Sequence, residues 1–230
     1  MSEPNRPGRT TDTMATDPVL RAIVREVESR LDDDAAHDMG HLTRVADWTV
    51  RLAGDAVTAR VCIAAALLHD IVNIPKTHPD RARASEQSAA VARALLPQFD
   101  FTTDEITSIA DAIRDHSFSR GAVPESTLGK ALQDADRLEA LGVIGTFRCV
   151  ATGVRFDAEF FHATDPWASH RPLDDAHYSV DHYFTKLLRL PATFHTTGGR
   201  DEAERRADVM RRLLESLALE LGQPLTRVVD

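Results

Sequence analysis

The segment of residues 57–70 constrains the fold more than any other part of this chain. It is apolar on nearly every side, and its uninterrupted apolar run, Val61–Leu68, is far too short to cross a bilayer. A helix with apolar side chains all round has to be surrounded by other elements of the fold. The sequence therefore predicts a central buried helix. That helix ends in His69 and Asp70, which are unusual residues to place in a core.

Apolar residues recur at helical spacing along most of the remaining chain, and no alternating strand pattern of useful length occurs. Thr102 and Glu105 have the spacing of a capping box, which predicts the start of a helix. The expected fold class is all-α, with one long irregular segment at residues 164–177. Helices are also expected over residues 20–31, 42–52, 80–96, 126–140, 142–162, 177–190 and 199–221.

The length of 230 residues favours one domain rather than two. We expect this domain over residues 17–222. Residues 1–16 are rich in proline, threonine and charge, so they are expected to form a disordered N-terminal tail. Residues 223–230 are expected to form a short C-terminal tail.

Charge and cysteine content limit the binding partners and the cellular compartment that are expected for this chain. The formal net charge is −9, so a broad basic face that holds a nucleic acid polymer is not expected, whereas a small phosphorylated ligand in a local basic pocket is compatible with it. Cys62 and Cys149 each lie in an apolar run and are expected to be small buried hydrophobic residues. The chain has no signal-peptide pattern and no apolar run of membrane-spanning length, which predicts a cytoplasmic protein.

Four residues combine metal-binding chemistry with positions that face the core. His41 and Asp136 each share a helical stripe with apolar residues, and His69 and Asp70 end the central helix. A buried carboxylate is costly unless it is paired or bound to a metal. Two imidazoles and two carboxylates suit a divalent ion such as Mn, Fe, Zn, Ni or Mg. The alternative is a separate hydrogen bond for each residue within a helical core, and four such residues together favour the metal.

Other residues have positions suited to a phosphorylated substrate. Arg44 lies one turn from His41 on the same face and is a candidate phosphate clamp. Lysine is rare in this arginine-rich chain, and Lys76 and Lys186 are candidate phosphate-binding residues, with a solvated surface role as the alternative. His116 lies on an apolar stripe. It either donates a proton to the leaving group or has a structural role beside the site.

Several short motifs agree in order and spacing with a known family. They are HDMGHLTRV (37–45), ALLHDIVNIPK (66–76), AIRDHSFS (112–119), QDADRLEALG (133–142), HRPLDD (170–175) and DHYFTKLLRLP (181–191). Together they resemble the small stand-alone bacterial members of the HD superfamily of metal-dependent phosphohydrolases. The resemblance extends over about residues 18–221, and therefore over nearly the whole expected domain.

The resemblance implies a single-domain helical bundle with a metal ion between its helices, held by His41, His69, Asp70 and Asp136. Superfamily members with two metal ions usually supply extra histidines from the helix that follows the HD pair. Residues 80–96 contain none, so we expect a mononuclear site. Manganese is the first expectation, with Mg, Fe, Ni, Co or Zn as alternatives.

The same resemblance bears on activity, because some close relatives hydrolyse nucleoside triphosphates to the monophosphate and pyrophosphate. That reaction is the first expectation. A nucleoside monophosphate or cyclic nucleotide phosphoesterase and a catalytically silent nucleotide-binding domain are the alternatives. Catalytic roles are expected for Asp70, His116 and Arg44, a nucleotide is the expected partner, and a homodimer is an open alternative to a monomer. Many nucleotidase-type relatives carry an acidic residue where this chain has Asn73, so no general base is assigned.

Overall fold

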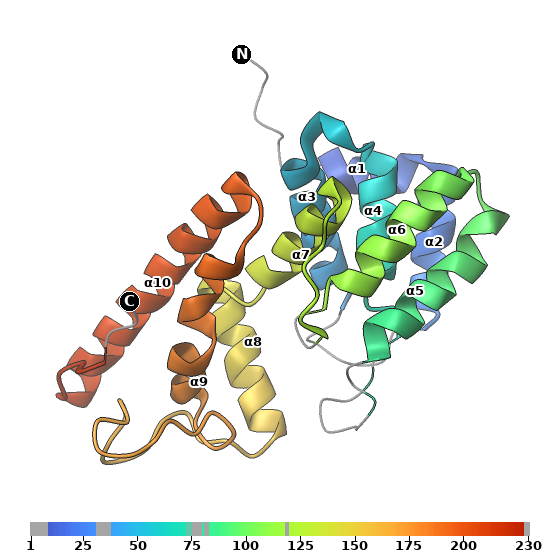
Figure 1. The fold of residues 1–230 in the computed structure, drawn as a ribbon. Helices are drawn as coiled ribbons and strands as arrows, with labels where there is room; N and C mark the ends of the chain where they lie inside the picture. The colour runs from blue at the N-terminus through green and yellow to red at the C-terminus, as the bar shows by residue number, and fades with distance from the viewer. Residues whose placement is uncertain are drawn as a thin grey trace. The chain divides into compact units, whose positions relative to one another are not determined.

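Helix α4 (Ala59–Leu68) is the buried centre of the first half of the chain. All of Val61–Leu68 is at most 4% exposed. The helix packs against α2 (Pro18–Glu28), α3 (Met39–Ala53) and α6 (Thr103–Asp115), each of which turns an apolar face toward it (Figure 1). The prediction of a central buried helix is confirmed.

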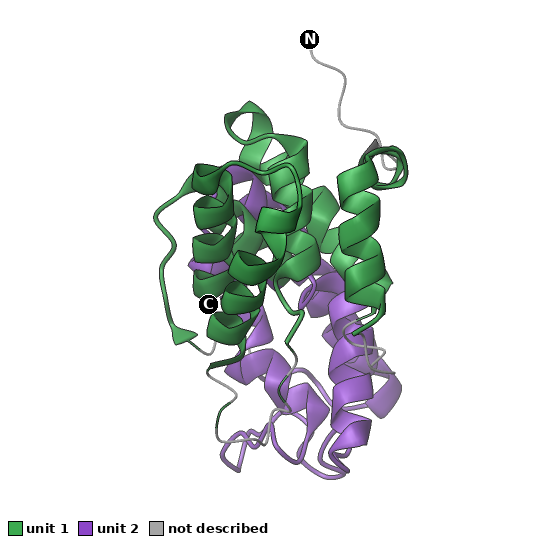
Figure 2. Ribbon diagram, turned by 90° about the vertical axis from the view of Figure 1, so that its right-hand side faces the viewer, with its two compact units in different colours: residues 1–136 green, residues 137–230 purple. Residues whose placement is uncertain are grey.

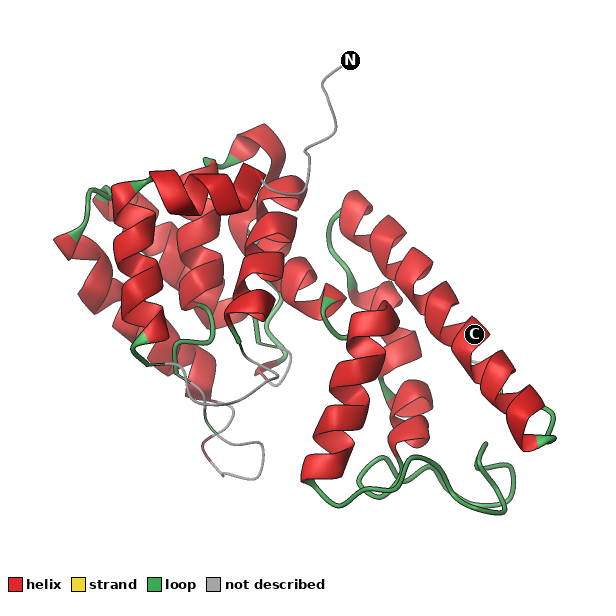
Figure 3. Cartoon of the chain, turned by 180° about the vertical axis from the view of Figure 1, so that it is seen from behind, coloured by secondary structure: helices red, strands yellow, loops and turns green. Residues whose placement is uncertain are grey.

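The structure is a computed structural model that describes residues 9–30, 38–72, 74, 80, 83–117 and 120–227. Among these residues helices alternate with loops and no strand of a sheet occurs (Figure 3). One isolated bridge joins Glu159 and Tyr178. The all-α prediction is confirmed. Within the same ranges, no helix combines the length and the apolar character that crossing a membrane requires.

The chain divides into two compact units, residues 1–136 and 137–230, where the sequence predicted a single domain over residues 17–222 (Figure 2). Helix α7 begins in the first unit and ends two residues inside the second. Besides α2, α3, α4 and α6, the first unit contains α1 (Arg9–Thr16), η1 (Gly54–Ala56), α5 (Ala84–Leu95), η3 (Leu96–Gln98) and most of α7 (Thr127–Leu138). The second unit contains α8 (Gly142–Arg155), α9 (Ser179–Thr185), η5 (Leu187–Thr193) and α10 (Thr197–Leu221).

Polar side chains fix where several helices begin. The Asp38 carboxylate caps α3 by accepting a hydrogen bond from the backbone N–H of His41 at 2.7 Å. Thr102 and Glu105 form the predicted capping box at the start of α6, in which the Thr102 hydroxyl accepts from the Glu105 N–H at 3.2 Å and the Glu105 carboxylate accepts from the Thr102 N–H at 2.8 Å. These bonds satisfy N–H groups that have no partner inside the helix.

The prediction of a disordered tail over residues 1–16 is wrong for residues 9–16, which form α1. The Thr10 hydroxyl donates to the Asp47 carboxylate at 3.0 Å, and Met14 is buried against the core of the first unit. A helix of eight residues has little stability alone, so these tertiary contacts hold it. Composition could not reveal them. Residues 1–8 lie outside the described residues.

Two predicted helices of the second unit are shorter than expected. The helix predicted over residues 142–162 ends at Arg155, because Asp157 adopts a left-handed φ of 56° and the Ala158 N–H turns back to the Gly153 carbonyl at 2.9 Å. Aspartate tolerates this backbone region better than most residues with a Cβ. The helix predicted over residues 177–190 is divided into α9 and the 3₁₀ segment η5.

The two cysteines are free thiols. Cys62 is completely buried in α4, and this burial raises the pKa of its thiol to about 12. Cys149 is only half-buried on α8, and its Sγ lies 3.6 Å from the Ser179 carbonyl. The prediction of a buried thiol is therefore confirmed for Cys62 and wrong for Cys149.

The irregular segment 164–177 is held to its own unit by a buried ion pair. The Arg171 guanidinium donates to both Asp181 carboxylate oxygens, at 2.5 and 2.8 Å, and the Asp174 backbone N–H donates to the same carboxylate at 2.7 Å. Asp181 is completely buried. This bonding fixes the segment against α9.

The predicted C-terminal tail also contacts this segment. Its described part, residues 223–227, is not helical. The Arg227 guanidinium donates to the Trp167 carbonyl at 2.9 Å and to the Ala168 carbonyl at 2.6 Å. Ala168 is buried and has a φ of 50°, which is strained for a residue with a Cβ. Arg227 therefore stabilises a turn that the local sequence disfavours.

Replacement of Arg171 by leucine should lower the free energy of unfolding by about 3–5 kcal/mol, because it leaves the buried Asp181 carboxylate without its cation. Urea denaturation of the purified variants measures this loss. Arg205→Leu is the matched control, since Arg205 pairs with Glu202 at the surface and should contribute less than about 1 kcal/mol. Equal losses in the two variants would contradict the assignment.

Candidate metal centre

His69 forms the C-cap of α4 and is completely buried. Its Nδ1 lies 2.7 Å from the carbonyl oxygen of Ala66. A carbonyl only accepts, so the Nδ1 carries a proton, and the Nε2 faces away from α4. Within the described part of the chain this Nε2 makes no hydrogen bond, and the nearest carboxylate oxygens, on Asp70 and Asp136, are 3.5 and 3.8 Å away. A buried nitrogen in this state is costly unless something binds it.

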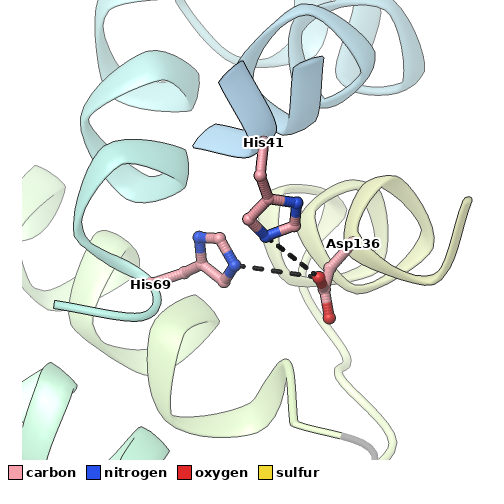
Figure 4. Close-up of side chains that lie close together, drawn as sticks. All are labelled: His41, His69 and Asp136. Carbon is pink, nitrogen blue, oxygen red and sulfur yellow. Dashed lines mark ion pairs between the residues drawn. The ribbon is translucent and has the colours of Figure 1, made fainter. Parts of the chain in front are cut away.

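Three of the four predicted ligands converge from three helices (Figure 4). His41 comes from the first turn of α3, His69 from the end of α4 and Asp136 from α7. The His41 Nε2 and the His69 Nε2 lie 3.7 and 3.8 Å from the same Asp136 Oδ1. Metal–ligand bonds of about 2.0–2.2 Å allow two donor atoms to lie up to about 4.3 Å apart. The donor atoms present therefore fit a single divalent ion.

Asp70 joins a second group with His69 and His116. Its Oδ2 lies 3.5 Å from the His69 Nε2, and its Oδ1 lies 3.5 Å from the His116 Nε2. The two groups share His69, so they form one cluster of five residues rather than two independent sites. The sequence left open what His116 contacts, and the structure places it directly against Asp70.

His116 is oriented in the same way as His69. It is the C-cap of α6, it is 3% exposed, and its Nδ1 donates to the Ile113 carbonyl at 2.6 Å. The last carbonyls of a helix lack partners inside it, so an imidazole at the cap can bind the carbonyl three residues earlier. Both rings then direct the Nε2 into the cluster, and their centroids lie 4.9 Å apart. A hydrogen bond of this kind at the second ring nitrogen is typical of metal-binding histidines.

The cluster is open to solvent on its carboxylate side. His41 and His69 are 1% and 0% exposed, whereas the side chains of Asp70 and Asp136 keep 17% and 29% of their surface exposed. The imidazoles therefore form the closed wall of the site. Catalytic metal sites need an open position of this kind for water and substrate.

Opposite charges dominate the electrostatics. Burial lowers the pKa of His69, but the Asp70 carboxylate, followed by that of Asp136, outweighs this effect and raises the pKa to about 9. Burial raises the pKa of Asp136, but the interaction with His69 and the charges of His41 and His116 hold it well below its usual range. At neutral pH the site therefore contains carboxylates that attract a cation.

Of the three predicted phosphate-binding residues, the structure describes two, Arg44 and Lys186. Arg44 is half-buried on α3, one turn after His41. Lys186 belongs to the second unit, where it follows α9. Lys76 lies outside the described residues, as does Asn73.

Gln133 is a positioning residue that the sequence analysis did not single out. It is completely buried, and its Nε2 donates to the carbonyls of Asp115 and Ala122 at 2.8 and 3.0 Å. These bonds connect α7, which carries Asp136, to the chain on both sides of His116. The available signal was an amide at a core-facing position of an amphipathic helix, which requires buried partners.

Comparison with known proteins gives consistent matches. Residues 38–141 match the HD domain family. The chain is 31% identical over 193 residues to the uncharacterized protein YpgQ of Bacillus subtilis (strain 168), covering 81% of this chain and 85% of that protein. The crystal structure of B. subtilis YpgQ in complex with ADP matches with a TM-score of 0.67 and 25% identity, over 87% of this chain and 96% of the other. A predicted HD superfamily hydrolase from an uncultured Thermotogales bacterium matches with a TM-score of 0.62 and 27% identity, over 91% and 97%.

Substitution of His69 by alanine should weaken manganese binding by more than about 100-fold, because it removes a buried donor atom that faces both carboxylates. Calorimetric titration of the metal-free protein with Mn²⁺ measures the change. His177→Ala is the matched control, since the His177 side chain is 75% exposed and contacts Asp174 far along the chain from the cluster. Unchanged affinity in His69→Ala would exclude the proposed ligand set.

The affinity for the metal should rise with pH until about pH 9, by up to about tenfold per pH unit. The reason is that the raised pKa of His69 makes a proton compete with the metal ion below that value. Titrations at several pH values, with buffers of different ionisation enthalpy, give both the affinity and the number of protons released. A flat affinity between pH 6.5 and 9 would show that the His69 imidazole is not a ligand.

Proposed function

The chain belongs to the HD superfamily, and on that premise we propose that it is a metal-dependent phosphohydrolase that acts on nucleotides at a single divalent ion. The observation that carries the proposal is the cluster itself. The buried imidazoles of His41 and His69 and the Asp136 carboxylate lie at distances that suit one metal ion, and the Asp70 carboxylate lies 3.5 Å from the same His69 Nε2. Without a metal ion, only a proton on an imidazole would balance the carboxylates, as the raised pKa of His69 indicates.

The ligands in this proposal are His41, His69, Asp70 and Asp136. A divalent ion held there supplies Lewis acidity toward a phosphoryl oxygen and toward water. Manganese remains the first expectation because imidazole and carboxylate together suit it, and Mg, Fe, Ni, Co and Zn remain alternatives. The partly exposed side of Asp70 and Asp136 is the side from which a substrate enters.

Arg44, Lys76 and Lys186 are proposed to bind the phosphates. The guanidinium of Arg44 can bind a phosphate through two parallel hydrogen bonds, and the two lysines would act as compact point charges. These cations offset the negative charge that builds up on the phosphate oxygens in the transition state. Such electrostatic stabilisation is usually the largest contribution to the rate of phosphoryl transfer.

His116 has two possible roles in this proposal. In the first, the His116 Nε2 delivers a proton to the leaving group. In the second, the same nitrogen orients the Asp70 carboxylate, which lies 3.5 Å away. Loss of proton donation lowers kcat by about 10²–10⁴-fold at saturating metal, whereas loss of orientation mainly lowers the affinity for the metal by about 10–100-fold.

The first substrate class proposed is the nucleoside triphosphates, hydrolysed to the monophosphate and pyrophosphate. A nucleotide ligand is supported by the YpgQ structure, which was determined in complex with ADP. The acidic net charge of −9 is compatible with a small ligand and unfavourable for a nucleic acid polymer.

A screen of metals against substrates tests the proposal. Nucleoside tri-, di- and monophosphates and cyclic nucleotides are incubated with Mn²⁺, Mg²⁺, Co²⁺, Ni²⁺ or Zn²⁺, and chromatography separates pyrophosphate from orthophosphate. We expect release of pyrophosphate from triphosphates, and at least about 100-fold less in Asp70→Ala because that variant loses a ligand and a catalytic carboxylate.

His177→Ala is again the control and should keep full turnover, because its exposed imidazole lies outside the cluster. Turnover of monophosphates or cyclic nucleotides alone would move the proposal to a phosphoesterase. Stoichiometric metal without turnover on any of these substrates would contradict an enzymatic role and favour a nucleotide-binding domain.

A further inference from the structure

The C-terminal end of α7 carries one of the proposed metal ligands. Asp136 lies in the last turn of this helix, which ends at Leu138. The last carbonyls of a helix have no partner inside it, so a terminal turn frays unless other groups bind it. A fraying turn would carry the Asp136 carboxylate away from the His41 and His69 nitrogens, which lie 3.7 and 3.8 Å from its Oδ1.

Two arginine side chains bind this end of the helix within the second unit. The Nη1 of Arg137 donates to the Thr193 carbonyl at 2.7 Å. The Nη1 of Arg206, on α10, donates to the Leu138 carbonyl at 2.7 Å, and the backbone N–H of Leu141 donates to the same carbonyl at 3.1 Å. Leu138 is completely buried, so its carbonyl depends on partners within the protein.

The guanidinium of Arg206 is itself held in place. Its Nε donates to the Glu202 carboxylate at 2.7 Å, and both side chains are only 12% exposed. The donors of a guanidinium form a rigid fork, so this bond also sets the direction of the Nη1. Gly142 has a φ of 71°, and a Cβ there would lie 3.3 Å from the Cβ and the Cγ of Arg206. Glycine at this position therefore leaves room for the arginine stem beside the chain that follows α7.

We propose that Arg206 is a positioning residue that holds the Asp136 carboxylate in the metal centre by binding the end of α7. The proposal rests on the proposed metal centre and adds to it a residue from α10. Helix α7 continues without a break from Thr127 to Leu138, so a bond to its last carbonyl restrains the turn that contains Asp136. A cation at the C-terminus of a helix also interacts favourably with the helix dipole.

Calorimetric titration of the metal-free protein with Mn²⁺ tests the proposal. Arg206→Met removes the donor but keeps an unbranched stem beside Gly142. It should weaken Mn²⁺ binding by at least about tenfold, because loss of a group that orients a ligand costs about 10–100-fold in metal affinity. Arg206→Lys keeps the charge and should recover part of this loss, since an ammonium lacks the rigid fork of the guanidinium.

Arg205→Met is the matched control. The Nε of Arg205 donates to the same Glu202 carboxylate at 2.7 Å, and the Arg205 side chain is 65% exposed. The control therefore removes the same charge from beside the same carboxylate without removing the bond to α7. Its affinity for Mn²⁺ should equal that of the wild-type chain.

Thermal melting of each variant, followed by circular dichroism with and without Mn²⁺, separates positioning from a purely structural role. A purely structural role would lower the Tm of metal-free Arg206→Met but leave its Mn²⁺ affinity, and hence the rise in Tm on adding Mn²⁺, as in the wild-type chain. That result would overturn the proposal.

If Arg206→Met does not fold, Arg206→Lys decides: weaker Mn²⁺ binding in this folded variant supports the proposal, and wild-type affinity overturns it. A wild-type chain that binds no Mn²⁺ would overturn the metal centre itself. A wild-type chain that binds Mn²⁺ no more tightly than Arg206→Met would overturn only the role of Arg206.

Discussion

The hydrogen bond from the His69 imidazole to the Ala66 carbonyl is the interaction on which the metal centre depends. It satisfies a carbonyl that α4 leaves without a partner at its C-terminus, and at the same time it fixes the ring so that the Nε2 faces the carboxylates. His116 repeats the arrangement at the end of α6 through Ile113. Helices α4 and α6 thus each end in a histidine whose side chain has two roles. Its Nδ1 caps the helix, and its Nε2 faces the cluster.

The surrounding packing makes this arrangement permanent. Helix α4 is buried all round, so it cannot shift without disturbing close packing on every side. The capping carboxylate of Asp38 fixes the first turn of α3, which carries His41, and the Gln133 amide holds α7, which carries Asp136. The helices that carry His41 and Asp136 are therefore held by bonds that lie outside the cluster. The His69 and His116 imidazoles keep their orientation before any ion binds, which lowers the reorganisation that binding requires.

The sequence predicted those features that depend on local spacing. The all-round apolar pattern identified α4, the Thr102 and Glu105 spacing identified the start of α6, and the core-facing positions of His41, His69 and Asp136 identified residues that lie together in the structure. The contact between His116 and Asp70 could not be predicted from spacing, because it depends on how the ends of α4 and α6 meet. Helix α1 was missed because it is held by the remote contact to Asp47, and α8 was predicted too long because a non-glycine residue, Asp157, supplies its left-handed end.

The hydrogen bonds between Arg227 and the turn at Ala168 bear on where the second unit, residues 137–230, can be cut. The last regular element, α10, finishes at Leu221, and a boundary drawn from secondary structure would be placed there. A fragment cut at that point would lack the guanidinium that binds two carbonyls of a strained, buried turn some sixty residues earlier. For excision, grafting or fusion of the second unit, its C-terminal limit is therefore set by a hydrogen bond and not by the end of a helix.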